Sequence, residues 1–286
     1  MIGMKRKFSF WDVLIWAVLL VVFLVMFYPF FYTLFMAVMP HDEFVRRQVH
    51  VVPAGFTLDY VMQVLNNPRL ARAFLNSILR TGIGTVMSVI VTVMVGYALS
   101  RKSLPGRKAF NMLFIIPMWI IPGMIPYYLT IRAVGLLGSF WAMIIPMLIS
   151  SFNMFIARAY FYGFPQELLE ASKIDGAGEF KTFLRIVWPT STPLIATMAL
   201  LIGSLHWNDF FWPGILVPHD WQPAPVVLHR IVSNRVELFG LGQGAQIQPQ
   251  SFISAVAAIL IVPVLVVYPF LQKYVVKGIM LGSVKG

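Results

Sequence analysis

The stretch from residue 165 to residue 189 combines acidic side chains with very small ones, in a chain that is otherwise strongly apolar. Glu170 and Asp175 supply charges that could pair with a basic partner. Small side chains, which let another surface approach closely, stand at Ala171, Ser172, Gly176, Ala177 and Gly178. This makeup favours docking of a short helix pair into a groove of another protein. The alternative is an amphipathic loop resting on lipid, and the mixed charge leaves both interpretations open.

A second group of residues has the chemistry to bind a sugar. In "HWNDFFWP", aromatic faces such as that of Trp207 suit the apolar faces of pyranose rings, while Asn208 and Asp209 could hydrogen-bond to hydroxyl groups. Asn153, in an apolar stretch, could line a cavity or bond to a neighbouring helix. An aromatic belt at the membrane surface is the alternative explanation for the tryptophans.

The sequence lacks the residues for several kinds of catalysis, metal binding and energy coupling. There is no G-x-x-x-x-G-K-[ST] phosphate loop and no cysteine, and the five histidines lack metal-ligand spacing with acidic residues. The central parts of the apolar segments contain no Asp, Glu, Lys or Arg, which ion-coupled transporters usually need. We therefore expect no catalytic residue, no bound metal and no cofactor in this chain. Any active transport would draw its energy from another polypeptide.

The elements that position these residues are predicted to be membrane-spanning helices. The chain is 59% hydrophobic and 12% charged, against about 25% charged residues in soluble domains. No alternating strand pattern of an outer-membrane barrel is present, so we predict an all-α polytopic protein. Six apolar segments approach the ~20 residues that a spanning helix needs. They are residues 13–35, 81–100, 109–131, 140–157, 190–217 and 252–271.

The basic residues predict how these helices are oriented. The first segment is too long for a signal peptide and is interpreted as a retained helix. Most of the 22 basic residues then fall on the side that holds both termini, which places the termini in the cytoplasm. The same topology puts residues 165–189 in the cytoplasm. The net charge of +11 fits this orientation pattern, and no compact basic domain suggests nucleic-acid binding.

The polar stretch itself is predicted to form a helix, a turn and a second helix. Pro165 suits the start of a first helix, because its missing N–H costs nothing in a first turn. Gly176 and Gly178 interrupt that helix, and a second one is expected to end before Pro189. The pair would lie at the cytoplasmic surface.

One passage carries a resemblance to a known family. "EASKIDGAGEFKTFLRIVWP" resembles the E-A-A…D-G-A…F…I…P signature of permease subunits in bacterial ABC importers, with Ser172 in place of the second alanine. "WNDFFWP" and the C-terminal "KGIMLGSVKG" look like the corresponding parts of six-span permeases of the maltose type. The chain looks closest to importers of complex oligosaccharides and polysaccharides, a group that includes alginate importers.

The resemblance implies a non-catalytic transport subunit, a single transmembrane permease domain over residues 1–286, in the inner (plasma) membrane. Residues 165–189 would form a coupling helix that docks on a dimer of ABC ATPase subunits, which bind ATP and Mg. Glu170 would pair with the ATPase and Gly176 would form the turn. The cytoplasmic tail, residues 272–286, would reach towards the same interface.

The resemblance also implies two further partners, one outside the cytoplasm and one within the membrane. An extracytoplasmic sugar-binding protein would deliver the substrate, and a second permease subunit of different sequence would complete the pathway. Gln243 and Gln246 could contact the binding protein, although a plain flexible loop is the default. Arginines between residues 46 and 72 could favour an acidic sugar, while docking or solvation explains them equally well. The alternative functions are a permease of the same family for another small solute, a channel working alone, and a membrane enzyme.

Overall fold

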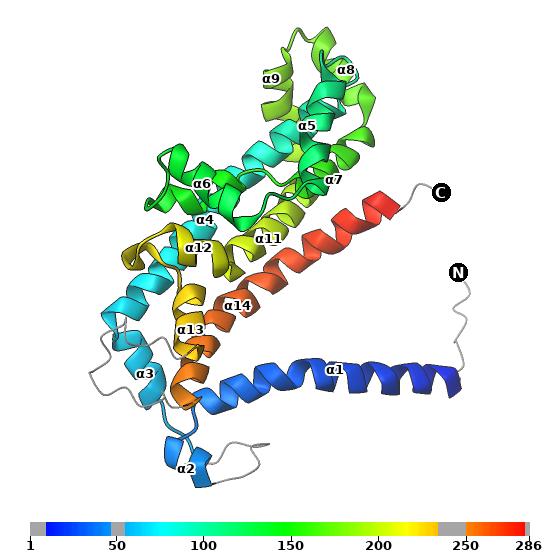
Figure 1. Ribbon diagram of the computed structural model, residues 1–286. Coiled ribbons are helices and arrows are strands. Elements are labelled where there is room, and N and C mark those ends of the chain that lie inside the picture. Colours follow the sequence, from blue (N-terminus) through cyan, green and yellow to red (C-terminus); the bar gives the residue numbers. More distant parts are fainter. Residues whose placement is uncertain (1–9, 47–54, 234–249, 284–286) are drawn as a thin grey trace. The chain divides into compact units, whose positions relative to one another are not determined.

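The computed structural model describes residues 10–46, 55–233 and 250–283, and their side chains except at position 41 and beyond position 270. Over these ranges the chain is helical and contains no β-strand (Figure 1). The all-α prediction is therefore confirmed. The chain divides into two compact units, one of residues 1–67 with 231–261 and one of residues 68–230 with 262–286.

The first unit begins with a long helix that is apolar on every side. Helix α1 (Phe10–Ala37) exposes almost all of its side chains, and only its last two residues are buried. A helix without a polar face suits a lipid or protein surrounding rather than water. Short helices α2 (His41–Arg46) and α3 (Asp59–Asn66) follow, and Met36 and Met39 pack with Tyr32 and Phe44 at the end of α1.

The second unit is built around helix α4 (Pro68–Ser100), which packs against α7 (Ser151–Tyr162) and α11 (Thr192–Asn208). Two glycines of α4 permit this packing. A Cβ atom on Gly96 would lie 2.7 Å from the Cβ of Ala157, and one on Gly84 would lie 2.8 Å from the ring of His206. Neither distance is possible for real side-chain carbons, so both contacts require glycine.

Shorter elements lie between these three helices and after α11. They are α5 (Arg107–Trp119), α6 (Met124–Ala133), η1 (Phe140–Met143), η2 (Ile145–Met147), α8 (Gln166–Ile174), α9 (Glu179–Thr182), η3 (Phe183–Val187), α10 (Trp188–Thr190), α12 (Phe211–Leu216), η4 (His219–Trp221) and α13 (Ala224–Val232). The last helix, α14 (Gln250–Ser283), contributes residues to both units. It continues through most of the segment expected to be a tail, residues 272–286.

The helices differ from the expected spans mainly where proline or a polar residue interrupts them. In the part that the structure describes, three unbroken helices are long and apolar enough to cross a membrane, or up to five spans if two bent helix pairs are counted. The expected spans 13–35 and 252–271 lie within α1 and α14. The expected span 81–100 starts too late, because its helix already begins at Pro68.

The other three expected spans are broken. Segment 109–131 is divided between α5 and α6, and Pro122 lies in the break. Segment 140–157 starts with two 3₁₀ turns, which include Pro146, and meets α7 at 45°. Segment 190–217 divides at Asp209 into α11 and α12. The number of membrane crossings, six, stays a prediction.

The glycine contacts of α4 lead to a stability prediction. Gly96→Ala should lower the free energy of unfolding by about 1–3 kcal/mol, because the added methyl group overpacks the contact with Ala157. Gly82→Ala is the matched control on the same helix, since nothing lies within 4 Å of its Cβ position. Thermal unfolding of the purified protein in detergent measures both. Equal melting temperatures for the two variants would contradict the packing described here.

Candidate functional site

The polar stretch forms two short helices joined by a tight turn. Helix α8 follows Pro165 and ends in a left-handed residue, Gly176, whose φ is +72°. Two backbone hydrogen bonds close the turn: the N–H of Gly176 donates to the carbonyl of Lys173, and that of Ala177 donates to the carbonyl of Ser172. This pair of bonds satisfies the last carbonyls of a helix and demands glycine at the left-handed position. The predicted role of Gly176 in the turn is therefore visible in its backbone.

The second helix is longer and less regular than expected. It runs from α9 through a π-helical turn, η3, into α10, and only Ser191 separates it from α11. Its predicted end before Pro189 is wrong, because Pro189 lies near the start of α10, where its missing N–H is tolerated. The helices on either side of the break at Ser191 differ in direction by 79°.

One face of this stretch belongs to the protein core. Leu169, Phe183 and Val187 share a buried cluster with residues of α4, α7 and α11, called here the central cluster. Its members are Val89, Val93, Tyr97, Ala157, Phe161, Phe164, Leu169, Phe183, Val187, Leu194, Met198 and Ile202. The Tyr97 ring lies 5.4 Å from that of Phe183. Because the same side chains pack the spans and the polar stretch, the two form one body.

Polar contacts strengthen the attachment of the stretch to α4. The hydroxyl groups of Ser172 and Thr182, both buried, lie 2.5 Å apart and join the two short helices. The carboxylate of Glu179 accepts a hydrogen bond from the Tyr97 hydroxyl at 3.4 Å and pairs with Arg101 at 3.5 Å. Ser172, which stands at the signature's second alanine position, is therefore buried and makes a contact within the fold.

The opposite face of the stretch is open. Glu170, Ala171, Asp175 and Gly176 are exposed, whereas Ala177 is half-buried. Two large apolar side chains are exposed as well: Ile174 with 86% of its surface accessible and Phe180 with 64%. Neither residue was predicted from the sequence as part of a site. Their signal was a large apolar residue at the end of the first short helix and another near the start of the second, in a stretch that is otherwise polar.

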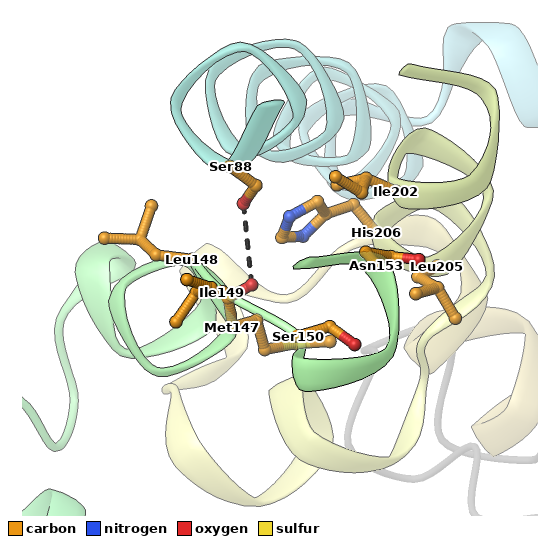
Figure 2. Close-up of a pocket in the computed structure, with 9 residues that line it drawn as sticks. All are labelled: Ser88, Met147, Leu148, Ile149, Ser150, Asn153, Ile202, Leu205 and His206. Carbon is orange, nitrogen blue, oxygen red and sulfur yellow. Dashed lines mark hydrogen bonds between the residues drawn. The ribbon is translucent and has the colours of Figure 1, made fainter. Parts of the chain in front are cut away.

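A cavity of about 240 Å³ lies between α4, α7, α11 and the turns before α7 (Figure 2). Its lining residues are Ser88, Met147, Leu148, Ile149, Ser150, Asn153, Ile202, Leu205 and His206. Figure 2 shows the His206 ring projecting between Ser88 and Asn153, and the Ser88 hydroxyl donating to the carbonyl of Met147 at 3.5 Å. The buried Nδ1 of His206 has no hydrogen-bond partner among the described residues. The wall is thus mainly apolar, with a few polar groups that can orient a ligand.

The predicted sugar-binding residues are distributed unevenly around this cavity. Asn153 is buried and lines it, and its contact with substrate stays a prediction. Trp207 is buried but does not line it, and the amide of Asn208 donates to the carbonyl of Ser204 on its own helix. Asp209 lies at the end of α11. Gln243 and Gln246 lie outside the described residues.

Asp209 pairs with a buried arginine, Arg80, that lies just outside the expected span 81–100. The Arg80 side chain has no exposed surface, and its Nη2 lies 2.7 Å from Oδ2 of Asp209. Arg80 lies one residue before the expected span 81–100 but inside α4, since that helix extends back to Pro68. The missed signal was Asp209 itself, because an acidic residue within an apolar segment requires a partner.

Comparison with known proteins places the chain in a family. Residues 73–281 match the model of the "binding-protein-dependent transport system inner membrane component". The chain belongs to this family. It is 36% identical to the polygalacturonan/rhamnogalacturonan transport system permease protein YtcP of Bacillus subtilis, over 86% of this chain and 87% of that protein. It is 38% identical to the protein LplC of the same organism, over 85% and 84%.

A solved structure shares the fold. A chain in the crystal structure of a bacterial ABC transporter involved in the import of the acidic polysaccharide alginate aligns with a TM-score of 0.83 at 27% identity. The alignment covers 95% of this chain and 100% of that one. The expected permease family and importer fold are confirmed. The chain is an inner-membrane permease subunit of a binding-protein-dependent transport system.

The two phenylalanines of the second short helix lead to a prediction about stability. Phe183→Ala should lower the free energy of unfolding by about 3–5 kcal/mol, since it empties a buried position of the central cluster. Phe180→Ala, three residues away, removes an exposed ring and should change stability by less than about 0.5 kcal/mol. Thermal unfolding of the two purified variants tests this. A larger loss for Phe180→Ala would mean that the polar stretch packs differently.

Proposed function

We propose that this permease moves an oligosaccharide or polysaccharide fragment across the inner membrane, powered by cytoplasmic ABC ATPase subunits that dock on residues 165–189. The observation that carries the proposal is the two-sided structure of that stretch. Its inner face belongs to the central cluster, and its outer face is exposed. A partner that pushes the outer face would therefore move α4, α7 and α11 as well.

The exposed face has the chemistry of a docking surface. Ile174 and Phe180 supply apolar surface that is more than half exposed, and Glu170 and Asp175 supply charge for a basic partner. Apolar anchors surrounded by charged groups are typical of protein interfaces. ATP and Mg would bind to the ATPase dimer, and this chain would bind neither. Both termini would lie in the cytoplasm with this stretch.

The substrate class follows from the relatives and fits the cavity. The similar proteins are named for polygalacturonan or rhamnogalacturonan and for alginate, and others for arabinooligosaccharides. At about 240 Å³ the cavity is smaller than the ~300–1,000 Å³ of pockets that enclose a whole ligand. It would accommodate part of an extended saccharide. Asn153, Ser88 and His206 would hydrogen-bond to its hydroxyl groups.

The remaining partners complete the pathway. A second permease subunit, of different sequence, would form the rest of the transport pathway. An extracytoplasmic binding protein would deliver the saccharide. Gln243 and Gln246 stay candidates for contact with that binding protein. The name of the matched family, which specifies dependence on a binding protein, supports this partner. A permease of the same family for another small solute is the alternative.

Docking can be tested by co-purification from the native membrane in mild detergent. Glu170→Ala and Phe180→Ala should each lower the amount of co-purified ATPase by about tenfold, as expected for interface anchors worth about 1–2 kcal/mol. Ser103→Ala, on another exposed loop, is the control. Full ATPase recovery with both variants would show that residues 165–189 are not part of the interface.

Substrate class can be tested with the purified complex in proteoliposomes, supplied with its binding protein. We expect ATP-dependent uptake of an acidic oligosaccharide such as an oligogalacturonate, competed weakly by neutral sugars of equal length. Uptake without ATP would indicate a channel. ATP-dependent uptake of another solute class, with no response to oligosaccharides, would favour the alternative permease.

A further inference from the structure

Arg80 is the only Lys, Arg, Asp or Glu that the described part of the chain buries completely. Its guanidinium nitrogens contact three residues distant from it in the sequence. Nη2 donates to the Asp209 carboxylate at 2.7 Å and lies 3.6 Å from the Sδ atom of Met147. Nη1 donates to the carbonyls of His206 and Asp209 at 3.0 and 3.1 Å. One side chain of α4 thus binds η2, the end of α11 and the residue that follows it.

These contacts fix the corner between α11 and α12. The last carbonyls of a helix lack intrahelical partners, and a cation near them is favourable. Arg80 satisfies two carbonyls at this end of α11. The other oxygen of Asp209, Oδ1, accepts hydrogen bonds from the N–H groups of Phe211 and Trp212 at the start of α12. Asp209 therefore links the end of one helix to the beginning of the next.

Two of the groups that Arg80 holds belong to residues of the cavity wall. Met147 and His206 both line the cavity, whereas Arg80 itself does not. The His206 ring also fits against Gly84, one turn along α4 from Arg80, where any Cβ atom would collide with it. Two contacts with α4 therefore position His206: Arg80 binds its backbone carbonyl, and Gly84 packs against its ring.

We propose that Arg80 is a positioning residue for transport: paired with Asp209, it holds Met147 and His206 in place and so sets the shape of the cavity. The inference rests on the proposed function only in that the cavity is taken to admit the saccharide. Because Asp209 uses both carboxylate oxygens for protein contacts, its role is to orient Arg80 and α12. The sugar contacts come from the wall residues instead.

The decisive variant removes both charges together. Replacing a buried ion pair by uncharged residues is often neutral for stability, whereas removing one partner leaves a costly buried charge. Arg80→Met combined with Asp209→Asn should therefore assemble with the ATPase as the unmodified protein does. If Arg80 positions the wall, this assembled double variant should still take up saccharide with an apparent KM raised by about tenfold or more.

A second readout reports on the cavity without any sugar. The chain has no cysteine, so a single introduced thiol is labelled without background. Ser150→Cys places a thiol in the half-buried part of the cavity wall, and Ser103→Cys places one on a distant exposed loop. In the double-variant background, the maleimide labelling rate should change by about threefold or more at Ser150→Cys. It should stay constant at Ser103→Cys.

The outcomes separate the possibilities. An assembled double variant with unchanged KM and unchanged Ser150→Cys labelling would overturn the proposal and leave the pair a stabilising contact. A changed labelling rate, together with absent uptake in the unmodified complex, would support the role of Arg80 and reject the saccharide assignment. If the double variant fails to assemble, Arg80→Lys decides, because lysine keeps the charge and loses the planar fork. Unchanged labelling and KM in that variant would then overturn the proposal.

Discussion

The closeness of helix α4 to its two neighbours is the constraint on which the second unit depends. At Gly96 the helix meets Ala157 of α7, and at Gly84 it meets the His206 ring of α11, both at distances that a methyl group would fill. Close approach through small residues is the main way that helices associate where lipid removes the hydrophobic drive. The cavity lies beside these contacts. Its walls are therefore defined by the same backbone geometry that holds the helices together.

The central cluster extends this geometry to the polar stretch. Tyr97 of α4 contacts the rings of Phe161 and Phe183, which come from α7 and from the π-helical turn. Packed interiors resist compression and transmit displacement. A surface loop with its own separate packing would absorb a push by bending. The polar stretch instead shares its core with the spans. The chain bends by 79° at Ser191, but this residue is buried, so the bend is packed by protein and is not open to solvent.

The helical class and the helix–turn–helix form of the polar stretch were predictable because their signals are local. Apolar segment length and the spacing from Glu170 to Pro189 can be seen in a short window of sequence. The Arg80–Asp209 pair joins residues 129 positions apart, and an arginine at the edge of an apolar segment looks the same whether it faces water or a carboxylate. The π-helical turn at Phe183 was equally hidden, since tertiary packing stabilises it and no residue type marks it.

Ion pairs fix both ends of the apolar part of α4, and this limits how the helix can adapt to the surrounding lipid. Arg80 pairs with Asp209 and Arg101 with Glu179, and about 20 residues lie between the two arginines, a rise of about 30 Å. Helices usually adapt to a thicker or thinner bilayer by letting long basic side chains reach for the headgroups. Here both side chains are already engaged with protein. A mismatch in bilayer thickness would then be met by deforming the bilayer or by tilting the whole packed unit, and a tilt would move the cavity and the polar stretch together.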